Sequence, residues 1–314
     1  MTDPVAVPST GPELTGAALD LPAPVERSEE APGSLPYVGL ATVLLLWGLG
    51  PPVSKLITAP PLTASFARLW TSSLAMLAVG VLSGHRPSRA SMRASLIGGV
   101  AFGLNSLVFF TALSNASIAT ITVIGSLQPA VVMLGASRLF GERVNRRVIA
   151  WTAVAIGGAV VAVLGAGASV HSNVLGVLCS IGSLLAMGVY FLASKQARRT
   201  LGAWEYVTGV MLWASILVTP VVALGGGLGH LDAIDHVDWF WLVVMLIGPG
   251  VGGQLIMGWS VRWVPVSLSA MILLGSTVVS ILAAWPIHGE QPTVVQLVGC
   301  TITLGAVGLI LQGR

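Results

Sequence analysis

Two cations lie inside apolar stretches of this chain, where a charged side chain is costly and usually has a function. Arg68 lies six residues inside an apolar run over 62–83, which is about 9 Å along a helix axis. Its guanidinium presents a planar fork of donors that matches a carboxylate, so it could bind an anionic group. Lys55 lies nearer to the end of its own run. For both residues the alternative is a side chain that extends to the lipid headgroups.

Polar and aromatic side chains also recur near the middles of the apolar runs. An amide or hydroxyl that faces lipid is costly, so we expect these groups to face inward. There the polar groups either bond to neighbouring helices or line a cavity, and the aromatic groups either wall that cavity or only pack. The candidate binding residues, besides Arg68, are Trp47, Asn105, Gln128, Tyr190, Gln254 and Ser276, with Trp259 as a further aromatic wall.

Prolines interrupt the apolar runs where a break in the helix could act as a gate. Each proline removes a helix hydrogen bond and frees the carbonyl four residues before it. In a membrane such a carbonyl either finds a partner on a neighbouring helix or lines a wet cavity. The candidates for helix breaks and gating are Gly48, Pro51, Pro129 and Pro249.

Several chemistries lack the residues that they require. The apolar runs hold no Asp, Glu or His at depth, so a proton relay or a carboxylate for a cationic ligand has no obvious carrier. Nucleophile–base pairs and metal-ligand spacing are also missing, so we expect no enzyme activity, no catalytic residue, no metal and no cofactor. Cys179 and Cys300 lie inside apolar runs and are interpreted as packing residues.

The composition is that of a helical protein that crosses a membrane many times. Hydrophobic residues make up 54% of the 314 residues and charged residues only 9%, against about 25% in soluble domains. A net charge of +3 does not indicate nucleic acid, because the bases lie in short loops. Residues 1–36 are predicted to form a disordered cytoplasmic tail. The predicted helices are 37–57, 62–83, 94–114, 117–138, 147–166, 174–195, 204–225, 238–260, 265–285 and 292–312.

The bases set the orientation of the chain in the membrane. With the N-terminus inside, the inner loops and tails carry 13 of the 15 bases, and only Lys55 and Arg68 remain. We therefore expect a multi-pass protein of the cytoplasmic (inner) membrane, with both termini cytoplasmic.

A glycine–glutamate turn recurs between apolar runs. Gly141-Glu142 returns 148 residues later as Gly289-Glu290, which indicates an internal repeat. The predicted fold is an all-α membrane protein with ten transmembrane helices in two five-helix repeats, 37–167 and 168–314. Five is odd, so the second repeat must be inverted, as in many secondary transporters. Gly99-x-x-x-Gly103 favours close helix packing, either within the chain or in a homodimer, so a monomer and a homodimer both stay open.

These features together resemble the drug/metabolite transporter superfamily, and specifically its EamA family of ten-helix proteins. The resemblance covers 37–314. Thr277 stands in the second repeat where the first has Pro129, so we expect the two halves to differ at the site. The resemblance implies a transporter with a central cavity between the repeats, and with the fifth and tenth helices at the periphery. The residues that carry it are Trp47-Gly48, Arg68, Pro129, Gly141-Glu142 and Gly289-Glu290.

The expected function is therefore a secondary transporter of small molecules that works by alternating access. A site with cations and no acids favours a small anion or zwitterion, so we expect an exporter of amino acids or related carboxylate-bearing compounds. The alternatives are an exporter of hydrophobic drugs or dyes, a non-transporting membrane protein and a membrane-embedded enzyme. The expected partners are the substrate and the lipid bilayer, and no nucleic acid.

Overall fold

The computed structural model describes residues 33–54, 56–82, 84, 87–116, 118–141, 145–165, 173–289 and 291–312. Most of the predicted tail, Lys55, both repeat glutamates and the predicted boundary at 167–168 lie outside these ranges. Helices are the only regular secondary structure within them. Their bounds are α1 Leu35–Ser54, α2 Pro61–Leu82, α3 Arg89–Asn115, α4 Ile118–Gly125, α5 Gln128–Phe140, α6 Arg146–Leu164, α7 Val174–Ala197, α8 Ala203–Leu224, η1 Gly227–Ala233, α9 His236–Met245, η2 Leu246–Gly252, α10 Gly253–Trp263, α11 Val266–Ile272, α12 Gly275–His288 and α13 Val294–Gln312.

These helices form ten apolar spans, as the sequence predicts. In the described part of the chain, nine are long and apolar enough to cross a membrane, and the shorter apolar helix at Val294–Ile310 makes the tenth. Helix α3 begins at Arg89 rather than at 94, because Ser88 and Ser91 cap it reciprocally through their side chains. Arg89 and Arg93 therefore lie on the first turns of a helix and not in a loop.

Three predicted helices are interrupted in the structure. The span predicted over 117–138 divides into α4 and α5, and Pro129 lies in the first turn of α5, where its missing N–H costs nothing. The span predicted over 265–285 divides into α11 and α12 at Leu273–Leu274, without a proline. Here Leu274 N donates to Met271 O and Thr277 N donates to Leu274 O. Hydrogen bonds between residues three apart therefore replace the α-helical bonds between residues four apart.

The span predicted over 238–260 has a different kind of break. Between α9 and α10 the seven residues of η2 form a π-helical turn that contains Pro249. Gly250 departs from helical geometry there, with φ −74° and ψ −106°. The equivalent span of the first repeat, α3, is continuous. The two repeats therefore differ at the centre of their third spans.

The repeated Gly-Glu turns share one backbone feature. Gly141 ends α5 and Gly289 ends α12, both in the left-handed region with φ of +65° and +70°. Only glycine adopts this conformation without cost, which explains why the turn keeps this residue in both repeats. Each repeat crosses the bundle five times, so the second repeat begins at the opposite end from the first.

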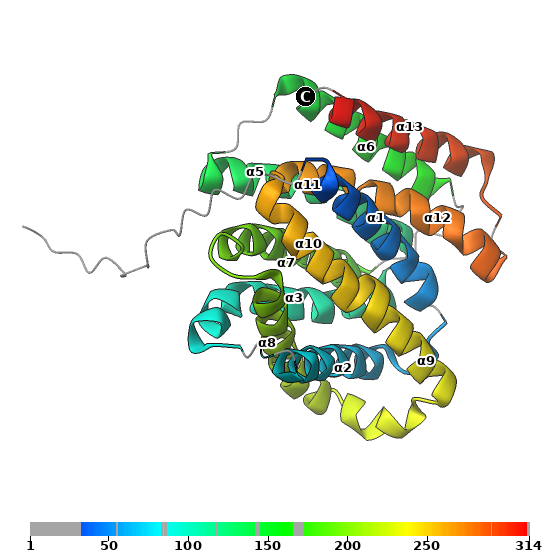
Figure 1. Ribbon diagram of the computed structural model, residues 1–314. Helices are drawn as coiled ribbons and strands as arrows, with labels where there is room; N and C mark the ends of the chain where they lie inside the picture. Colours follow the sequence, from blue (N-terminus) through cyan, green and yellow to red (C-terminus); the bar gives the residue numbers. More distant parts are fainter. Residues whose placement is uncertain are drawn as a thin grey trace, which may run out of the picture.

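The spans are arranged around α7 and α1 (Figure 1). Helix α7 packs along α3, and α1 packs between α12 and α10, so each pair joins one repeat to the other. Helices α6 and α13 lie side by side at one edge of the bundle and pack closely through Gly158 and Gly299. The end of the bundle at which α1 begins is called the near end below, and the other is the far end.

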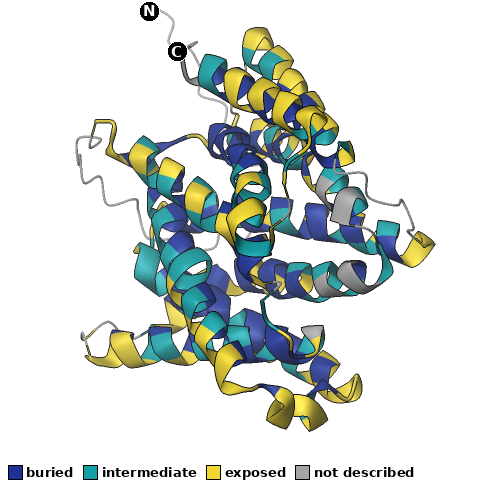
Figure 2. Ribbon diagram, turned by 90° about the vertical axis from the view of Figure 1, so that its right-hand side faces the viewer, coloured by how far each residue is buried: buried dark blue, intermediate teal, exposed yellow. Residues whose placement is uncertain are grey.

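Burial separates an interior from an apolar outer surface (Figure 2). The buried core includes Leu40 and Val43 of α1, Tyr190 of α7 and Met257 of α10. Many large apolar side chains remain exposed on the outside, as expected for a bundle whose solvent is lipid. Gly99 and Gly103 of α3 face α8, where a Cβ on Gly99 would lie 2.4 Å from Trp213 Cβ. This glycine motif packs helices within the chain.

Candidate functional site

An aromatic cluster joins helices of both repeats near mid-span. Trp47 of α1 meets Phe191 of α7 edge to face, with ring centroids 6.2 Å apart at 87°. Phe102 of α3 lies 5.2 Å from Tyr190 of α7, the residue next to Phe191. Edge-to-face and tilted pairs are favourable beyond their buried area. The cluster therefore fixes α1 and α3 of the first repeat against α7 of the second.

Trp47 is also bonded to the broken third span of the second repeat. Its indole Nε1 donates to the carbonyl of Pro249, 3.0 Å away. The amide of Gly253 reaches the carbonyl of Gly248 instead, and this leaves the Pro249 carbonyl to the indole. A Cβ on Gly253 would lie 2.6 Å from the indole nitrogen, so glycine is required at this position. The π-helical turn thus creates the acceptor that holds Trp47.

Tyr190 and Gln254 form a buried polar pair. The hydroxyl of Tyr190 donates to Gln254 Oε1, and the two residues are only 2% and 3% exposed. The pair links α7 to the start of α10, one residue after Gly253. It is a strong link, because an unpaired group in this position would lose its hydrogen bonds to water without replacement. The neighbouring Ser194 and Tyr206 hydroxyls bond at 3.0 Å.

Asn105 and Gln128 both reach α7 from the first repeat. Asn105 Oδ1 accepts a hydrogen bond of 2.7 Å from Ser183 Oγ. The Gln128 amide lies against the backbone of α7. In the orientation that satisfies both of its ends, its nitrogen donates to Leu184 O at 3.2 Å and its oxygen accepts from Gly188 N at 3.1 Å. Both side chains remain partly exposed. They combine a contact across the repeat interface with surface that a small molecule could still reach.

Gly48 is a point of close approach between α1 and α12. A Cβ here would lie 2.5 Å from Val279 Cβ and 2.8 Å from the backbone oxygen of Ser276. The hydroxyl of Ser276 bonds within its own helix, to Leu273 O at 2.7 Å. Helix α1 continues through Pro51 to Ser54 without a break. Gly48 and Ser276 therefore meet through backbone, directly beside the Trp47 anchor.

Arg68 is half-buried in α2 and has no charged or hydrogen-bonded partner among the described residues. It shares a helix face with Ser65 and Ser72, three residues before it and four after it. Ser65 bonds to Ser106 of α3 at 2.9 Å, and a Cβ on Gly250 would lie 4.0 Å from Ser72 Oγ. The Arg68 face of α2 is thus turned toward α3 and η2, and its side chain leans toward the far end, where α2 begins.

The structure brings these candidates together only in part. Trp47, Tyr190, Gln254 and Pro249 form one connected cluster, and Asn105 and Gln128 attach to the same helix, α7. Arg68 is joined to this cluster through the packing of α2 on η2 and α3, and Ser276 is joined to it through Gly48. Pro129 is buried at the start of α5, beside Gln128.

A cation clamp at the near end was not foreseen from the sequence. Lys195 Nζ donates to Val261 O and Val264 O, and Arg198 Nε to Gly258 O at 2.6 Å, so both cations bind the last turns of α10. Burial lowers the pKa of Arg198 to about 10, and it stays charged at neutral pH. Cations at a helix C-terminus are favourable. The sequence places these bases in an inner loop and assigns them only to orientation.

A carboxylate clamp closes the far end. Asp238, 1% exposed at the start of α9, accepts from Thr58 N at 2.7 Å and Ala59 N at 3.0 Å. It therefore ties the α1–α2 loop of the first repeat to the second repeat. His288 Nε2 of α12 also forms a hydrogen bond of 2.9 Å with Pro52 O, near the end of α1. Asp238 is the first residue of a predicted span, and nothing in the sequence indicates that its side chain is buried.

The comparisons with known proteins agree with this architecture. No significant match was found among curated proteins. A solved crystal structure superposes with a TM-score of 0.74 over 90% of this chain and 99% of that chain, at 21% identity, which shows a common fold. The model of the EamA-like transporter family matches twice, at residues 35–164 and 174–312. These two segments cover most of the chain and coincide with its two halves, so the protein is a membrane transporter that belongs to the EamA-like transporter family.

Proposed function

We propose that this protein is a secondary transporter that exports amino acids or related carboxylate-bearing metabolites across the cytoplasmic membrane. The observation that carries this substrate class is Arg68, a cation within a span that has no acidic partner among the described residues. A charge in this position is costly unless it is paired. A substrate carboxylate would supply the missing partner and fit the guanidinium fork.

The proposed binding residues lie on both repeats. Trp47 and Tyr190 would form the aromatic wall, and Asn105, Gln128 and Gln254 would supply amides, with Ser276 behind Gly48. Tyr190 and Gln254 are buried and bonded to each other in this conformation, so they would meet substrate only when the repeats move. Together with Arg68 the proposed binding residues would receive a molecule with one carboxylate and a small polar or apolar body. An uncharged hydrophobic drug is the second candidate, which the aromatic cluster around Phe191 favours.

Alternating access has a physical basis in the interrupted spans. The breaks at α4–α5, α11–α12 and η2 give the helices places to bend, since bonds there are already rearranged. The repeats are held together near the centre by the Trp47–Pro249 bond, and at the far end by Asp238. We propose that, during transport, the far-end contacts of Asp238 break and equivalent contacts between the repeats form at the near end.

We place the near end in the cytoplasm, because the loops and tails that the sequence assigns to this side hold 13 of the 15 bases. In a protein with Cys179 and Cys300 replaced by alanine, Asn145→Cys should react with an impermeant thiol reagent only from the cytoplasmic face. Gln291→Cys should react only from the outer face. Both positions are exposed and lie beside the two Gly-Glu turns. Reaction of both from one face would refute the inverted arrangement.

Gln128 tests the binding site. In sealed proteoliposomes, Gln128→Leu should reduce amino-acid flux about fivefold to tenfold, because leucine keeps the volume but loses both amide contacts to α7. The matched control is Gln196→Leu, an exposed glutamine near the end of the same helix, which should leave flux unchanged. Equal flux in wild type and Gln128→Leu, at equal protein content, would remove Gln128 from the site and weaken the proposed function.

A further inference from the structure

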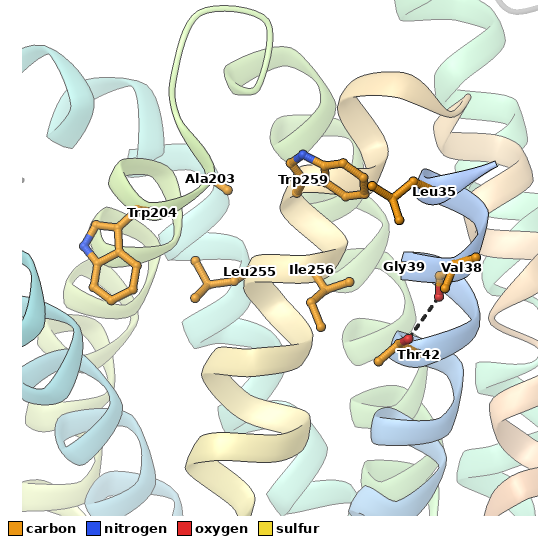
Figure 3. Close-up of a pocket in the computed structure, with 9 residues that line it drawn as sticks. All are labelled: Leu35, Val38, Gly39, Thr42, Ala203, Trp204, Leu255, Ile256 and Trp259. Carbon is orange, nitrogen blue, oxygen red and sulfur yellow. Dashed lines mark hydrogen bonds between the residues drawn. The ribbon is translucent and has the colours of Figure 1, made fainter. Parts of the chain in front are cut away.

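The outer surface of the bundle carries an apolar groove at the near end (Figure 3). Helix α10 forms its floor, and α1 and α8 form its two walls. The groove encloses about 540 Å³ and is open along one side. Its lining residues are Leu35, Val38, Gly39 and Thr42 of α1, Ala203 and Trp204 of α8, and Leu255, Ile256 and Trp259 of α10.

The groove lies at the height of the membrane-spanning segments. Leu35 and Val38 are 54% and 56% exposed on the first turns of the first span, so they face the surrounding solvent. In a membrane that solvent is lipid, and an apolar recess there accepts hydrocarbon. The single hydroxyl of the lining, on Thr42, bonds to Val38 O at 3.0 Å within its own helix. The indole Nε1 of Trp204 is buried without a hydrogen-bond partner among the described residues, and it points away from the groove (Figure 3).

A basic residue stands at the near-end mouth of the groove. Leu255, Trp259 and Arg262 follow one another at spacings of four and three, so they share one face of α10. Arg262 is exposed, one turn beyond Trp259, and its guanidinium lies 5.0 Å from the ring centroid of Trp263. This places a cation one turn beyond the apolar floor, toward the near end of α10.

The N-terminus of α8 lies at the same mouth. Gly202 provides no side-chain cap, and the first helical bond runs from Tyr206 N to Gly202 O. The amides of Ala203, Trp204 and Glu205 are therefore outside the helical bonds, and the first two residues line the groove. Free amides at a helix N-terminus favour an anion. The negative charge of Glu205 disfavours an anion here, but the nearby positive charge of Arg198 offsets it.

The charges at this end have a positive balance. The pKa of Arg198 is lowered mainly by burial and further by Arg262, while Glu205 acts in the opposite direction. The three groups therefore lie close enough to interact, as two cations with one acid. An approaching anion meets a net positive charge.

We propose that this groove binds one anionic phospholipid from the near-end leaflet, with an acyl chain along α10 and the phosphate between Arg262 and the start of α8. This site is separate from the repeat interface. A lipid held there would pack against α1, α8 and α10 at once. It would stabilise the conformation in which these helices form the groove.

The test uses the purified full chain in detergent, titrated with phosphatidylglycerol or with phosphatidylcholine of the same acyl chains, and observed by native mass spectrometry. Wild type should retain one phosphatidylglycerol in preference to phosphatidylcholine. Arg262→Gln should weaken the phosphatidylglycerol complex about fivefold, as expected for one basic residue at an anionic headgroup. The control is Arg93→Gln. Arg93 is exposed at the near end of α3, and its substitution should leave binding of phosphatidylglycerol unchanged.

A tryptophan that fills the groove separates the contribution of the apolar groove to lipid binding from the contribution of charge. Val38→Trp should reduce binding of both lipids, whereas Leu45→Trp, equally exposed on α1 but outside the groove, should not. Equal retention of the two lipids by wild type would overturn the proposal, and so would equal losses in Arg262→Gln and Arg93→Gln. Displacement of the lipid by millimolar inorganic phosphate would assign the mouth to a soluble anion and also contradict it.

Discussion

Arg68→Gln should lower the flux of an amino acid tenfold or more and leave that of an uncharged analogue nearly unchanged. Arg68 lies on the α2 face between Ser65 and Ser72, turned toward α3 and η2, without a partner in the described part of the chain. A hydrogen bond to a charged group contributes about 1.5–3 kcal/mol, or roughly 10- to 150-fold. Glutamine keeps a polar side chain but removes the charge and the fork.

Arg68→Lys distinguishes carboxylate binding from a contact with lipid headgroups. Lysine keeps the charge, so a residue that only reaches the headgroups should tolerate it. A bidentate carboxylate contact should not, because the ammonium group lacks the planar fork. The measurement is flux of an amino acid and of its N-acetyl amide, which carries no charge, in sealed vesicles, for wild type and both variants. An equal loss for the two substrates would leave Arg68 with a structural or gating role only.

Gly48→Ala should destabilise the protein, although alanine is the better helix former. The added Cβ would lie 2.5 Å from Val279 Cβ and 2.8 Å from Ser276 O, and neither the branch point nor the backbone can move aside cheaply. Overpacking of this kind costs about 1–3 kcal/mol. The gain in helix propensity is about 1 kcal/mol at most. We expect a lower thermal unfolding temperature in detergent and reduced flux, because the Trp47 anchor shifts with α1.

Gly50→Ala is the matched control for this substitution. It lies two residues further along α1, where a Cβ would meet only Pro249 side-chain atoms at 3.7 and 3.9 Å. These are ordinary contacts, but Pro51 follows directly, and a Cβ on the residue before a proline disfavours helical geometry, so part of the propensity gain is lost. We expect the unfolding temperature to fall clearly less than in Gly48→Ala. Similar losses in both variants would show that α1 is sensitive to any alanine, and that the close contact with α12 is not the cause.

The fold was largely predictable, because hydropathy and a repeated turn carry strong information. The ten spans follow from apolar runs of membrane length, and the duplication follows from Gly141 and Gly289, which both end helices in the left-handed conformation. The interruptions were predictable only where a proline marks them. The break at Leu273–Leu274 has no proline, and it depends on how α11 and α12 pack within the bundle.

The candidate site was predictable in composition but not in connection. Depth and polarity identified Trp47, Gln128 and Gln254, but the bond from Trp47 to Pro249 spans 202 residues and depends on the π-helical turn. Nothing in the sequence reveals the roles of Asp238 and Arg198, which are buried and hold backbone groups of other segments. Sequence position near a span end does not reveal whether a charge faces water or packs inside.

The most direct test of the proposed function is solute flux through the wild-type protein in sealed proteoliposomes. Vesicles loaded with a mixture of labelled amino acids, their uncharged analogues and an uncharged hydrophobic dye should release at least one amino acid. We expect this release to be saturable, to depend on the protein and to exceed the release of its uncharged analogue. Release of the dye with no protein-dependent release of any carboxylate-bearing solute would contradict the account and favour a drug exporter.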